Sequence, residues 1–243
     1  MPRFFTNEID DNKAYIKNDD AKHIKKVLRM KIGDTIDICD TNGYDYMGII
    51  SELSDGLVCV DLLEKSLSKS EPNINLTLYQ AVPKGDKMEF IIQKATELGA
   101  AKIVPVVTKY CVSRPDEKSA KKKTERYQRI ALEAAKQSQR GKIPVIENQI
   151  GFEQAISEMG KSQHSIIFYE KATDSFENAI KKASENNKDI SIMIGSEGGF
   201  SEEEIAWAME KGIQIVSLGN RILRCETAPL TAISIIMYET GNI

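Results

Sequence analysis

Along the first seventy residues, apolar and polar positions alternate in short runs that turn-forming residues separate. Alternation with a period of two is typical of half-buried strands. We expect such strands at residues 34–38, 44–53 and 57–63. Turn chemistry lies between these runs, with Thr-Asn-Gly at 41–43 and Ser-Asp-Gly at 54–56. The pattern predicts a small β-barrel over residues 1–70.

After a polar segment from Lys65 to Asn73, which we interpret as a linker, strands alternate with helices. Apolar runs predict strands at 74–81, 102–107, 165–169, 190–194 and 214–218. Segments with helical periodicity predict helices at 86–98, 124–139, 152–159, 175–184, 202–211 and 228–240. This alternation indicates an α/β fold with a mostly parallel sheet, in a second domain over residues 73–243.

Two of the helices have recognisable starts. A helix over about 21–27 in the first domain is expected to have Asp19 or Asp20 as its N-cap. Asp86 and Glu89 have the spacing of a capping box for the first helix of the second domain.

The composition is that of an ordinary globular protein. The 243 residues are 41% hydrophobic and 28% charged, and no stretch approaches the ~20 apolar residues of a membrane span. The N-terminus lacks the apolar run of a signal peptide, and the four cysteines form no CxxC pair, so we expect reduced thiols and a cytoplasmic location. With only His23 and His164 in the chain, neither a metal site nor a Ser-His-Asp site is expected.

Charge is unevenly distributed along the chain. The formal net charge is −3, but residues 84–142 hold 15 Lys and Arg against 7 Asp and Glu. Residues 1–83 hold 10 against 14, and residues 143–243 hold 8 against 15. A central basic block can bind phosphate groups although the whole chain is acidic. A solvated, lysine-rich helix face is the alternative interpretation of this block taken alone.

The loop Ile194–Ser201 (IGSEGGFS) follows a predicted strand, at the edge where open α/β sheets bind ligands. Its glycines match neither GxGxxG nor GxxxxGK[ST]. Ser201 is the expected cap of the next helix, and Glu197 with Glu202–Glu204 would repel a phosphate from its N-terminus. We therefore expect close backbone approach to an uncharged or cationic ligand. A plain Gly-rich turn before a capped helix is the alternative.

The loop Leu218–Pro229 (LGNRILRCETAP) is longer than the ~2–6 residues of an ordinary strand-to-helix connection. Thr227 is expected to cap the last helix, with Pro229 in its first turn. Charged residues surround an apolar pair in this loop, namely Arg221, Arg224 and Glu226 around Ile222 and Leu223. The combination suits a pocket for a flat base, and a surface cluster of salt bridges is the alternative.

Five segments carry a family resemblance: HIKKVLRMKIGD from His23, KGDKMEFIIQKATELGA from Lys84, ERYQRIALEAAKQSQRGKIP from Glu125, IGSEGGFSEEE from Ile194 and LGNRILRCETA from Leu218. On these segments the chain resembles the bacterial 16S ribosomal RNA uridine-N3 methyltransferases, the RsmE family of the SPOUT class. One departure is Ser196, which stands where the family often has proline. This difference should not affect backbone contacts of the loop.

The resemblance implies a fold that periodicity alone does not predict. Residues 1–70 would form a PUA-like, RNA-binding β-barrel, and residues 73–243 a SPOUT methyltransferase domain with a trefoil knot. Pattern reasoning reaches only an α/β domain with two ligand loops, because true knots are too rare to be predicted from topology rules. The resemblance also implies bent S-adenosylmethionine in a pocket that two chains form. The implied cofactor-binding residues are Tyr169, Glu170, Ile194, Gly195, Ser196, Glu197, Gly198, Gly199, Leu218, Gly219, Ile222, Leu223 and Ala228.

The implied reaction, methylation of uridine N3 in 16S rRNA, is an in-line displacement in which positioning does most of the work. N3 is a poor nucleophile until it loses its proton, so a base or a nearby positive charge must favour the anion. Glu197 and Glu226 are the candidate bases. Arg221 and Arg224 are candidates to stabilise the anion or to hold a phosphate.

Two further expectations concern partners, which are 16S rRNA, free or in the assembled small subunit, and a second copy of the chain. One basic surface across both domains is expected to bind RNA through Arg3, Lys22, Lys25, Lys26, Arg29, Lys84, Arg114, Arg126 and Arg140. The last helix is apolar around much of its circumference, at Leu230, Ile233, Ile235, Ile236, Met237 and Tyr238. This pattern means burial on more than one side, which an ordinary core helix explains as well as a dimer interface does. The family resemblance favours an obligate homodimer.

Two other functions stay open at this point. A ribose 2′-O-methyltransferase acting on tRNA or rRNA would fit the two loops as well. A non-catalytic RNA-binding adaptor would use only the barrel and the basic block. Calorimetry with S-adenosylmethionine distinguishes the adaptor from a methyltransferase, because an adaptor would show no heat of binding.

Overall fold

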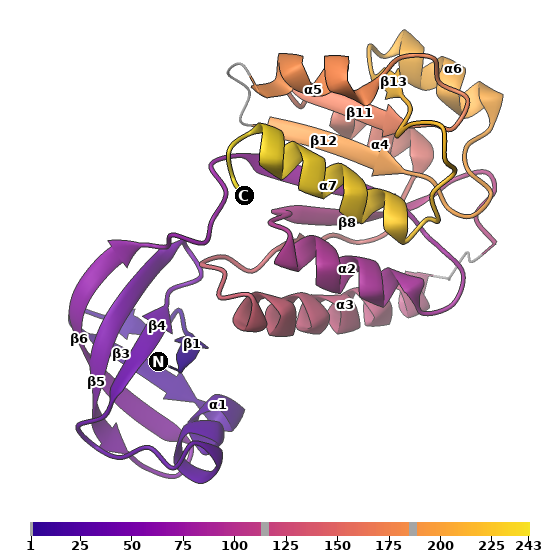
Figure 1. Ribbon diagram of the computed structural model, residues 1–243. Helices are drawn as coiled ribbons and strands as arrows, with labels where there is room; N and C mark the ends of the chain where they lie inside the picture. Colours follow the sequence, from indigo (N-terminus) through magenta and orange to yellow (C-terminus); the bar gives the residue numbers. More distant parts are fainter. Residues whose placement is uncertain (1, 113–116, 185–188) are drawn as a thin grey trace. The chain divides into compact units, whose positions relative to one another are not determined.

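The computed structural model describes residues 2–112, 117–184 and 189–243, and the chain divides into two compact units (Figure 1). The first unit comprises Met1–Glu71 together with Ala135–Ile143. The second unit comprises Pro72–Ala134 and Pro144–Ile243. A short segment from the middle of the chain therefore belongs to the N-terminal unit.

The first unit is built on a six-stranded mixed sheet with the strand order β1-β4-β5-β6-β3-β2. Its strands are β1 (Arg3–Phe5), β2 (Ile9–Asp10), β3 (Lys13–Lys17), β4 (Thr35–Cys39), β5 (Tyr44–Leu53) and β6 (Leu57–Leu67). β1 pairs with β4 in parallel, and the other pairs are antiparallel. The three strands predicted from alternation are confirmed as β4, β5 and β6. Strands β1 and β2 were missed because runs of two or three residues carry little periodicity, and β3 was missed although its five residues alternate between buried and less buried positions.

Alternating apolar residues of these strands form the core of the first unit, as the period of two requires. The predicted helix is present as α1 (Asn18–Lys22), followed by a π-helical turn, η1 (His23–Val27). Together they add Ala21 and Ile24 to the core. The predicted cap is wrong, because Lys17 is the N-cap, without a side-chain hydrogen bond, and Asp19 and Asp20 lie inside the first turn.

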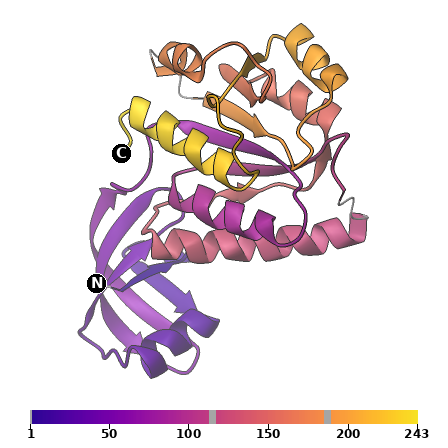
Figure 2. The ribbon, with the colours of Figure 1, turned by 45° about the vertical axis from the view of Figure 1, so that its right-hand side comes forward.

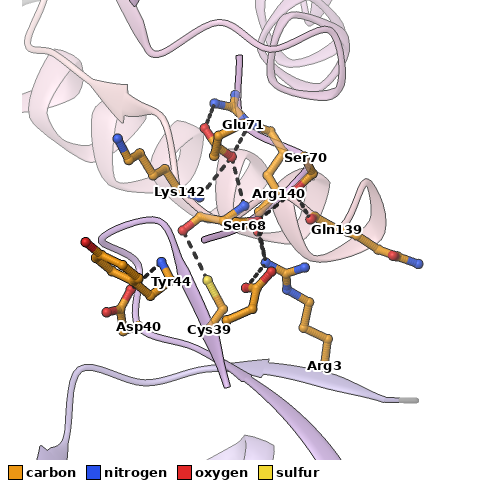
Figure 3. A network of polar contacts seen from close by, with 12 residues as sticks. Arg3, Cys39, Asp40, Tyr44, Ser68, Ser70, Glu71, Gln139, Arg140 and Lys142 are labelled. Atoms are coloured by element: carbon orange, nitrogen blue, oxygen red, sulfur yellow. Dashed lines mark hydrogen bonds and ion pairs between the residues drawn. The ribbon is translucent and has the colours of Figure 1, made fainter. Parts of the chain in front are cut away.

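The predicted linker from Lys65 to Asn73 is wrong at its start, because β6 continues to Leu67. The polar residues that follow bind the 135–143 segment (Figure 3). The Glu71 carboxylate accepts hydrogen bonds from the Arg140 guanidinium at 2.8 and 3.1 Å and from the backbone N–H groups of Gly141 and Lys142 at 2.8 and 3.0 Å. Ser70 and Glu71 therefore belong to a hydrogen-bond network, whereas Lys65, Lys69 and Asn73 of the same stretch are exposed.

The second unit contains a parallel sheet with the strand order β10-β8-β7-β12-β11-β13, with β9 paired to β8. Its strands are β7 (Asn75–Ala81), β8 (Lys102–Val107), β9 (Val145–Ile146), β10 (Ile150–Gly151), β11 (His164–Phe168), β12 (Asp189–Ile194) and β13 (Gln214–Val216). The predicted α/β fold with a mostly parallel sheet is confirmed. The two-residue strands β9 and β10 are too short to show a pattern.

Helices cover both faces of this sheet, so it has two cores. On one face lie α2 (Lys87–Glu97), α3 (Glu117–Gln137), α5 (Phe176–Ser184) and α7 (Thr227–Glu239). On the other face lie α4 (Phe152–Met159) and α6 (Glu202–Glu210). α3 runs beside α2 in both views, and α7 packs against α2 (Figures 1 and 2).

Three helix starts in this unit test the predicted caps. Ser201 caps α6 as expected, and its hydroxyl and the Glu204 carboxylate form a capping box. The capping box predicted for Asp86 and Glu89 is wrong, because Asp86 makes no side-chain cap hydrogen bond. The Thr227 cap is also wrong, since α7 begins at Thr227.

The carboxyl ends of β11, β12 and β13 face the same edge of the sheet, because neighbouring parallel strands run in one direction. The loops that follow β12 and β13 therefore meet there. The described part of the chain has no helix long and apolar enough to cross a membrane.

Candidate active site

A cavity of about 840 Å³ opens in the second unit between the loops after β12 and β13 and the end of β11. Every residue predicted to bind the cofactor lines it: Tyr169, Glu170, Ile194, Gly195, Ser196, Glu197, Gly198, Gly199, Leu218, Gly219, Ile222, Leu223 and Ala228. Arg221 and Arg224 line it as well. Seven lining residues were not predicted, namely Lys87, Phe168, Ala172, Phe200, Ser217, Asn220 and Cys225. Segments remote in sequence thus form one concave site.

The loop after β12 is held in a compact turn that excludes side chains. A Cβ atom on Gly195 would lie 3.1 Å from Gly199 Cα, and one on Gly198 would lie 2.7 Å from Tyr110 Cβ. Gly199 adopts a φ of +64°, a left-handed conformation that glycine tolerates best. The turn closes with the Gly199 N–H donating to the Ser196 carbonyl at 3.0 Å. Backbone atoms therefore form much of this wall of the cavity.

The loop after β13 also depends on a glycine, since Gly219 has a φ of +103°. Its N–H donates to the Ser217 hydroxyl at 3.1 Å. Ile222 is 85% exposed, although it is a large apolar residue at the cavity. Arg221 and Arg224 are exposed and make no ion pair with any described residue, so the alternative of a surface salt-bridge cluster does not describe these arginines.

Lys87, the first residue of α2, lies between two carboxylates at this cavity. Its Nζ is 2.8 Å from Glu197 Oε1 and 3.4 Å from Glu226 Oε2. The backbone N–H of Lys84 also donates to Glu197, at 3.3 Å to each carboxylate oxygen. The Cys225 thiol donates to Glu226 Oε2 at 3.2 Å. The two candidate bases of the sequence analysis are therefore brought together by a cation from a different part of the chain.

The cluster shifts the pKa values of its members. Partial burial alone would raise the pKa of Glu197, but hydrogen bonds from Lys87 and the Lys84 N–H bring it below the ordinary value. The hydrogen bond from Cys225, followed by the interaction with Lys87, lowers the pKa of Glu226. Glu197 raises the pKa of Lys87 through their hydrogen bond. Burial raises the pKa of the Cys225 thiol to about 12, so this thiol stays protonated and is not a nucleophile.

The charges fit a cationic ligand better than an anionic one on this side of the cavity. Glu197 and Glu226 are ionised, and Lys87 offsets only one of their two negative charges. Glu170 and Glu197 line the cavity, whereas Glu226 is not among its lining residues. A carboxylate-rich wall attracts a positively charged group such as a sulfonium. Among the described residues, no group of His, Cys, Asp and Glu has an arrangement that could hold a metal ion.

The residues predicted to bind RNA fall into two groups. Lys22, Lys25, Lys26 and Arg29 lie on or just after α1 and η1, and Lys84 and Arg126 lie in the second unit. Arg114 lies outside the described residues. The expectation of an exposed basic group is wrong for Arg140, which is 3% exposed because Glu71 and the surrounding backbone enclose it. The Arg3 side chain is 14% exposed and donates to Asp45 and to the Arg140 carbonyl.

Sequence reasoning missed Lys87, although a signal for it existed. A helix N-terminus carries partial positive charge, so a lysine at the first helical position is unfavourable unless carboxylates lie nearby. α2 begins with Lys87 close after β7, at the ligand-binding edge of the sheet. A positive charge at this helix start therefore indicates that carboxylates from another loop lie beside it.

Comparison with known proteins agrees with this geometry. Residues 69–237 match the RNA methyltransferase domain family, and residues 16–63 match the RNA methyltransferase PUA domain family. The first match covers most of the second unit, including the entire cavity.

Relatives match over nearly the full chain. The ribosomal RNA small subunit methyltransferase E of Bacillus subtilis is 36% identical, with 99% of this chain and 97% of the relative covered. The crystal structure of the Neisseria gonorrhoeae protein of the same name, bound to S-adenosyl methionine, is 30% identical, with 98% and 97% covered and a TM-score of 0.86. A putative methyltransferase from Legionella pneumophila, in complex with the same cofactor, is 27% identical, with 98% and 97% covered and a TM-score of 0.85. The chain therefore belongs to the ribosomal RNA small subunit methyltransferase E family.

Proposed function

We propose that this protein methylates small-subunit (16S) ribosomal RNA, with S-adenosylmethionine as the methyl donor and the N3 atom of a uridine as the acceptor. The observation that carries the proposal is the cavity, where two glycine-containing loops present backbone atoms beside a cluster of carboxylates. Family membership supports the reaction class, and the relatives' names give the class of RNA.

The residues present fit the cofactor. The backbone of Gly195–Gly199 and Leu218–Leu223 can lie against a flat adenine ring, because no side chain projects from the glycines. Glu170 and Glu197 line the cavity, and their negative charge would suit the positively charged sulfur of the cofactor. When bound, S-adenosylmethionine supplies an electrophilic methyl group.

The chain's own groups then handle the proton and the substrate. Glu197 and Glu226 are ionised at neutral pH, so either can accept the N3 proton. Arg221 and Arg224, exposed and without ion-pair partners in the described structure, can stabilise the negative charge that develops on the uracil or hold a phosphate. No metal is required, because alignment of donor and acceptor lowers the barrier of an in-line displacement.

The proposal includes a trefoil-knotted SPOUT domain over residues 73–243, a PUA-like barrel over residues 1–70, and a homodimer. Support for the dimer comes from α7, whose inner face is buried by its own chain while Ile235 and Tyr238 stay 37% and 69% exposed. Apolar side chains on an outer helix face are typical of an interface. Sedimentation at micromolar concentration tests this part, and a monomer would refute it.

RNA binding is proposed for the exposed cations of each unit. Lys26 and Arg29 lie beside the exposed apolar residues Val27 and Leu28, and neither cation has an ion-pair partner among the described residues. Exposed cations contribute to RNA affinity by releasing counterions from phosphates. Arg29→Ala should weaken RNA binding and reduce its salt slope by about one unit, with cofactor binding unchanged. An unchanged affinity would show that the RNA contacts lie elsewhere.

The decisive experiment is mass mapping of methylated nucleotides after incubation of 16S rRNA, and separately of assembled small subunits, with the protein and S-adenosylmethionine. A methyl group on a uracil base supports the proposal. A methyl group on a ribose 2′ oxygen would favour the 2′-O-methyltransferase instead. Absence of cofactor binding in calorimetry would leave only an RNA-binding adaptor.

A further inference from the structure

The Lys87 cluster combines an excess of carboxylates with partial access from the cavity. Its three side chains come from the start of α2 and from the two cavity loops. Lys87 is 35% exposed, Glu197 31% and Glu226 20%. Two carboxylates that share one cation would repel each other if that cation were absent.

We propose that Lys87 is a positioning residue for methyl transfer, which holds the Glu197 and Glu226 carboxylates side by side and ionised, so that one of them can accept the uridine proton. This inference rests on the proposed function. In the proton step, the N3–H bond breaks, an O–H bond forms on the carboxylate, and the electron pair stays on N3. Lys87 takes no proton itself, because its two carboxylate partners keep it protonated.

A carboxylate held by a cation is a weak base, so proton acceptance also depends on the charges that stabilise the uracil anion. Lys87, Arg221 and Arg224 are the cations that line the cavity. The remaining titratable groups at the cluster and in the lining are Glu170, Tyr169 and the Cys225 thiol, which donates to Glu226. Lys87 alone among these cations contacts both candidate bases in the described structure.

The test compares Lys87→Met and Lys87→Arg with the wild type. Lys87→Met keeps most of the length of the side chain and removes its charge, whereas Lys87→Arg keeps the charge. Lys94→Met is a matched control, since Lys94 lies on the same helix, is 33% exposed and pairs with Glu97 away from the cavity. Turnover is measured as a function of pH, and the glutamate carboxyl groups are titrated by carbon NMR, with assignments from Glu197→Gln and Glu226→Gln.

Loss of the cation should raise the pH at which one of the two carboxylates takes up a proton. We expect Lys87→Met to move the acid limb of kcat and one carboxyl titration upward by roughly one pH unit or more, which lowers kcat about tenfold at pH values below both midpoints and leaves it unchanged well above them. Lys87→Arg should restore both midpoints, and Lys94→Met should leave them unchanged.

The inference and the proposed function fail separately. A carboxyl titration that does not move in Lys87→Met, or a fall in kcat that is equal at every pH, would overturn the positioning role. A wild-type protein that binds no S-adenosylmethionine would overturn the proposed function, and the inference with it, whatever the carboxyl titration shows.

Discussion

Two of the clusters in which lysine or arginine meets glutamate, one from each unit, differ in how far water reaches them. In the first unit, Arg140 and Glu71 are 3% and 13% exposed, and the carboxylate accepts four hydrogen bonds (Figure 3). In the second unit, Lys87 faces two carboxylates, and all three groups remain between one fifth and about one third exposed. A balanced, enclosed pair can only hold structure, whereas an unbalanced, accessible cluster can also act on a ligand.

The difference also decides what each cluster contributes to stability. Two charges removed from water are costly unless geometry and additional hydrogen bonds compensate, and the Glu71 network supplies both. Breaking such a pair leaves an uncompensated buried charge. A cluster that is one fifth to about one third exposed is screened by water more than an enclosed pair, so its loss should cost less stability and be felt mainly in the chemistry. Substitution in the Arg140–Glu71 cluster should therefore lower mainly stability, and substitution in the Lys87 cluster should lower mainly activity.

The largest effect is expected on the cavity side, from Gly198→Val. Its side chain has no room, because even a Cβ atom would lie 2.7 Å from Tyr110 Cβ. Displacement of the loop should abolish S-adenosylmethionine binding, measured by calorimetry, while circular dichroism shows the fold retained. Gly219→Val should act through the backbone instead, since its φ of +103° disfavours valine although no atom lies within 4 Å.

Gly151→Ala is the control for these two variants, because nothing lies within 4 Å of its Cβ position and the residue is outside the cavity. It should bind the cofactor like the wild type. If both Gly198→Val and Gly219→Val bind the cofactor normally, the cofactor site lies elsewhere. The contrast between a structural cluster and a functional cavity would then be wrong.

In the first unit, Arg140→Met should lower the free energy of unfolding by about 3–5 kcal/mol, because the largely enclosed Glu71 carboxylate loses its cation and keeps only two backbone N–H donors. Chemical denaturation followed by circular dichroism measures the change. Lys25→Met is the control, since Lys25 and Asp55 form an exposed pair, and its midpoint should stay close to that of the wild type. Equal midpoints for Arg140→Met and Lys25→Met would contradict the role assigned to the buried pair.

Sequence patterns predicted the elements whose residues repeat with a clear period. Strands such as β12 and helices such as α2 and α7 were found close to their observed ends. Elements set by tertiary context were not, as for the two-residue strands β9 and β10. A helix was expected over residues 21–27, but the π-helical form of η1 was not. The segment 65–73 shows the same limit, because its polar residues look solvated until residues 139–142 are placed beside them.

The two loops of the cavity could be predicted from the sequence, but the residue from α2 that contacts them could not. Glycines and acids within Ile194–Ser201 and Leu218–Pro229 are visible as local motifs, and both loops line the cavity. Lys87 lies 110 residues before Glu197, and only the sheet order brings them together. The prediction for Arg140 was wrong in the opposite way. A basic side chain was expected on an RNA-binding surface, but Glu71 and the backbone enclose it.

A smaller effect on the structural side is expected from Gly141→Ala. A Cβ atom there would lie 2.3 Å from Ser68 Cβ, in the middle of the Glu71 network. Overpacking at such a site costs about 1–3 kcal/mol, and denaturation should show it without a change in cofactor affinity. Gly160→Ala is the control, because its nearest contact would be an ordinary 3.5 Å. Equal stabilities of the two variants would show that the network tolerates displacement.

The smallest effect concerns pH and belongs to the open cluster. The pKa values of Glu197 and Glu226 lie below the ordinary glutamate value in the folded protein. A carboxylate of this kind contributes stability that is present above its unfolded pKa and is lost as the pH falls through the lower, folded pKa. For these two residues the loss should therefore begin near pH 4.5 and continue below it. At neutral pH the contribution is complete.

Glu226→Gln removes one of these titrating groups and keeps the shape of the side chain. The difference in thermal midpoint between the wild type and Glu226→Gln should accordingly be constant from pH 8 to about pH 5 and shrink in acid. Scanning calorimetry at pH 7 and at about pH 3.5 measures this change. Asp55, Glu177 and Glu203 also have lowered pKa values, but they titrate alike in both proteins and cancel. A difference that stays the same in acid would mean that neither the Cys225 hydrogen bond nor Lys87 holds the Glu226 carboxylate in its ionised form, and the cluster would then be a chance arrangement of charges.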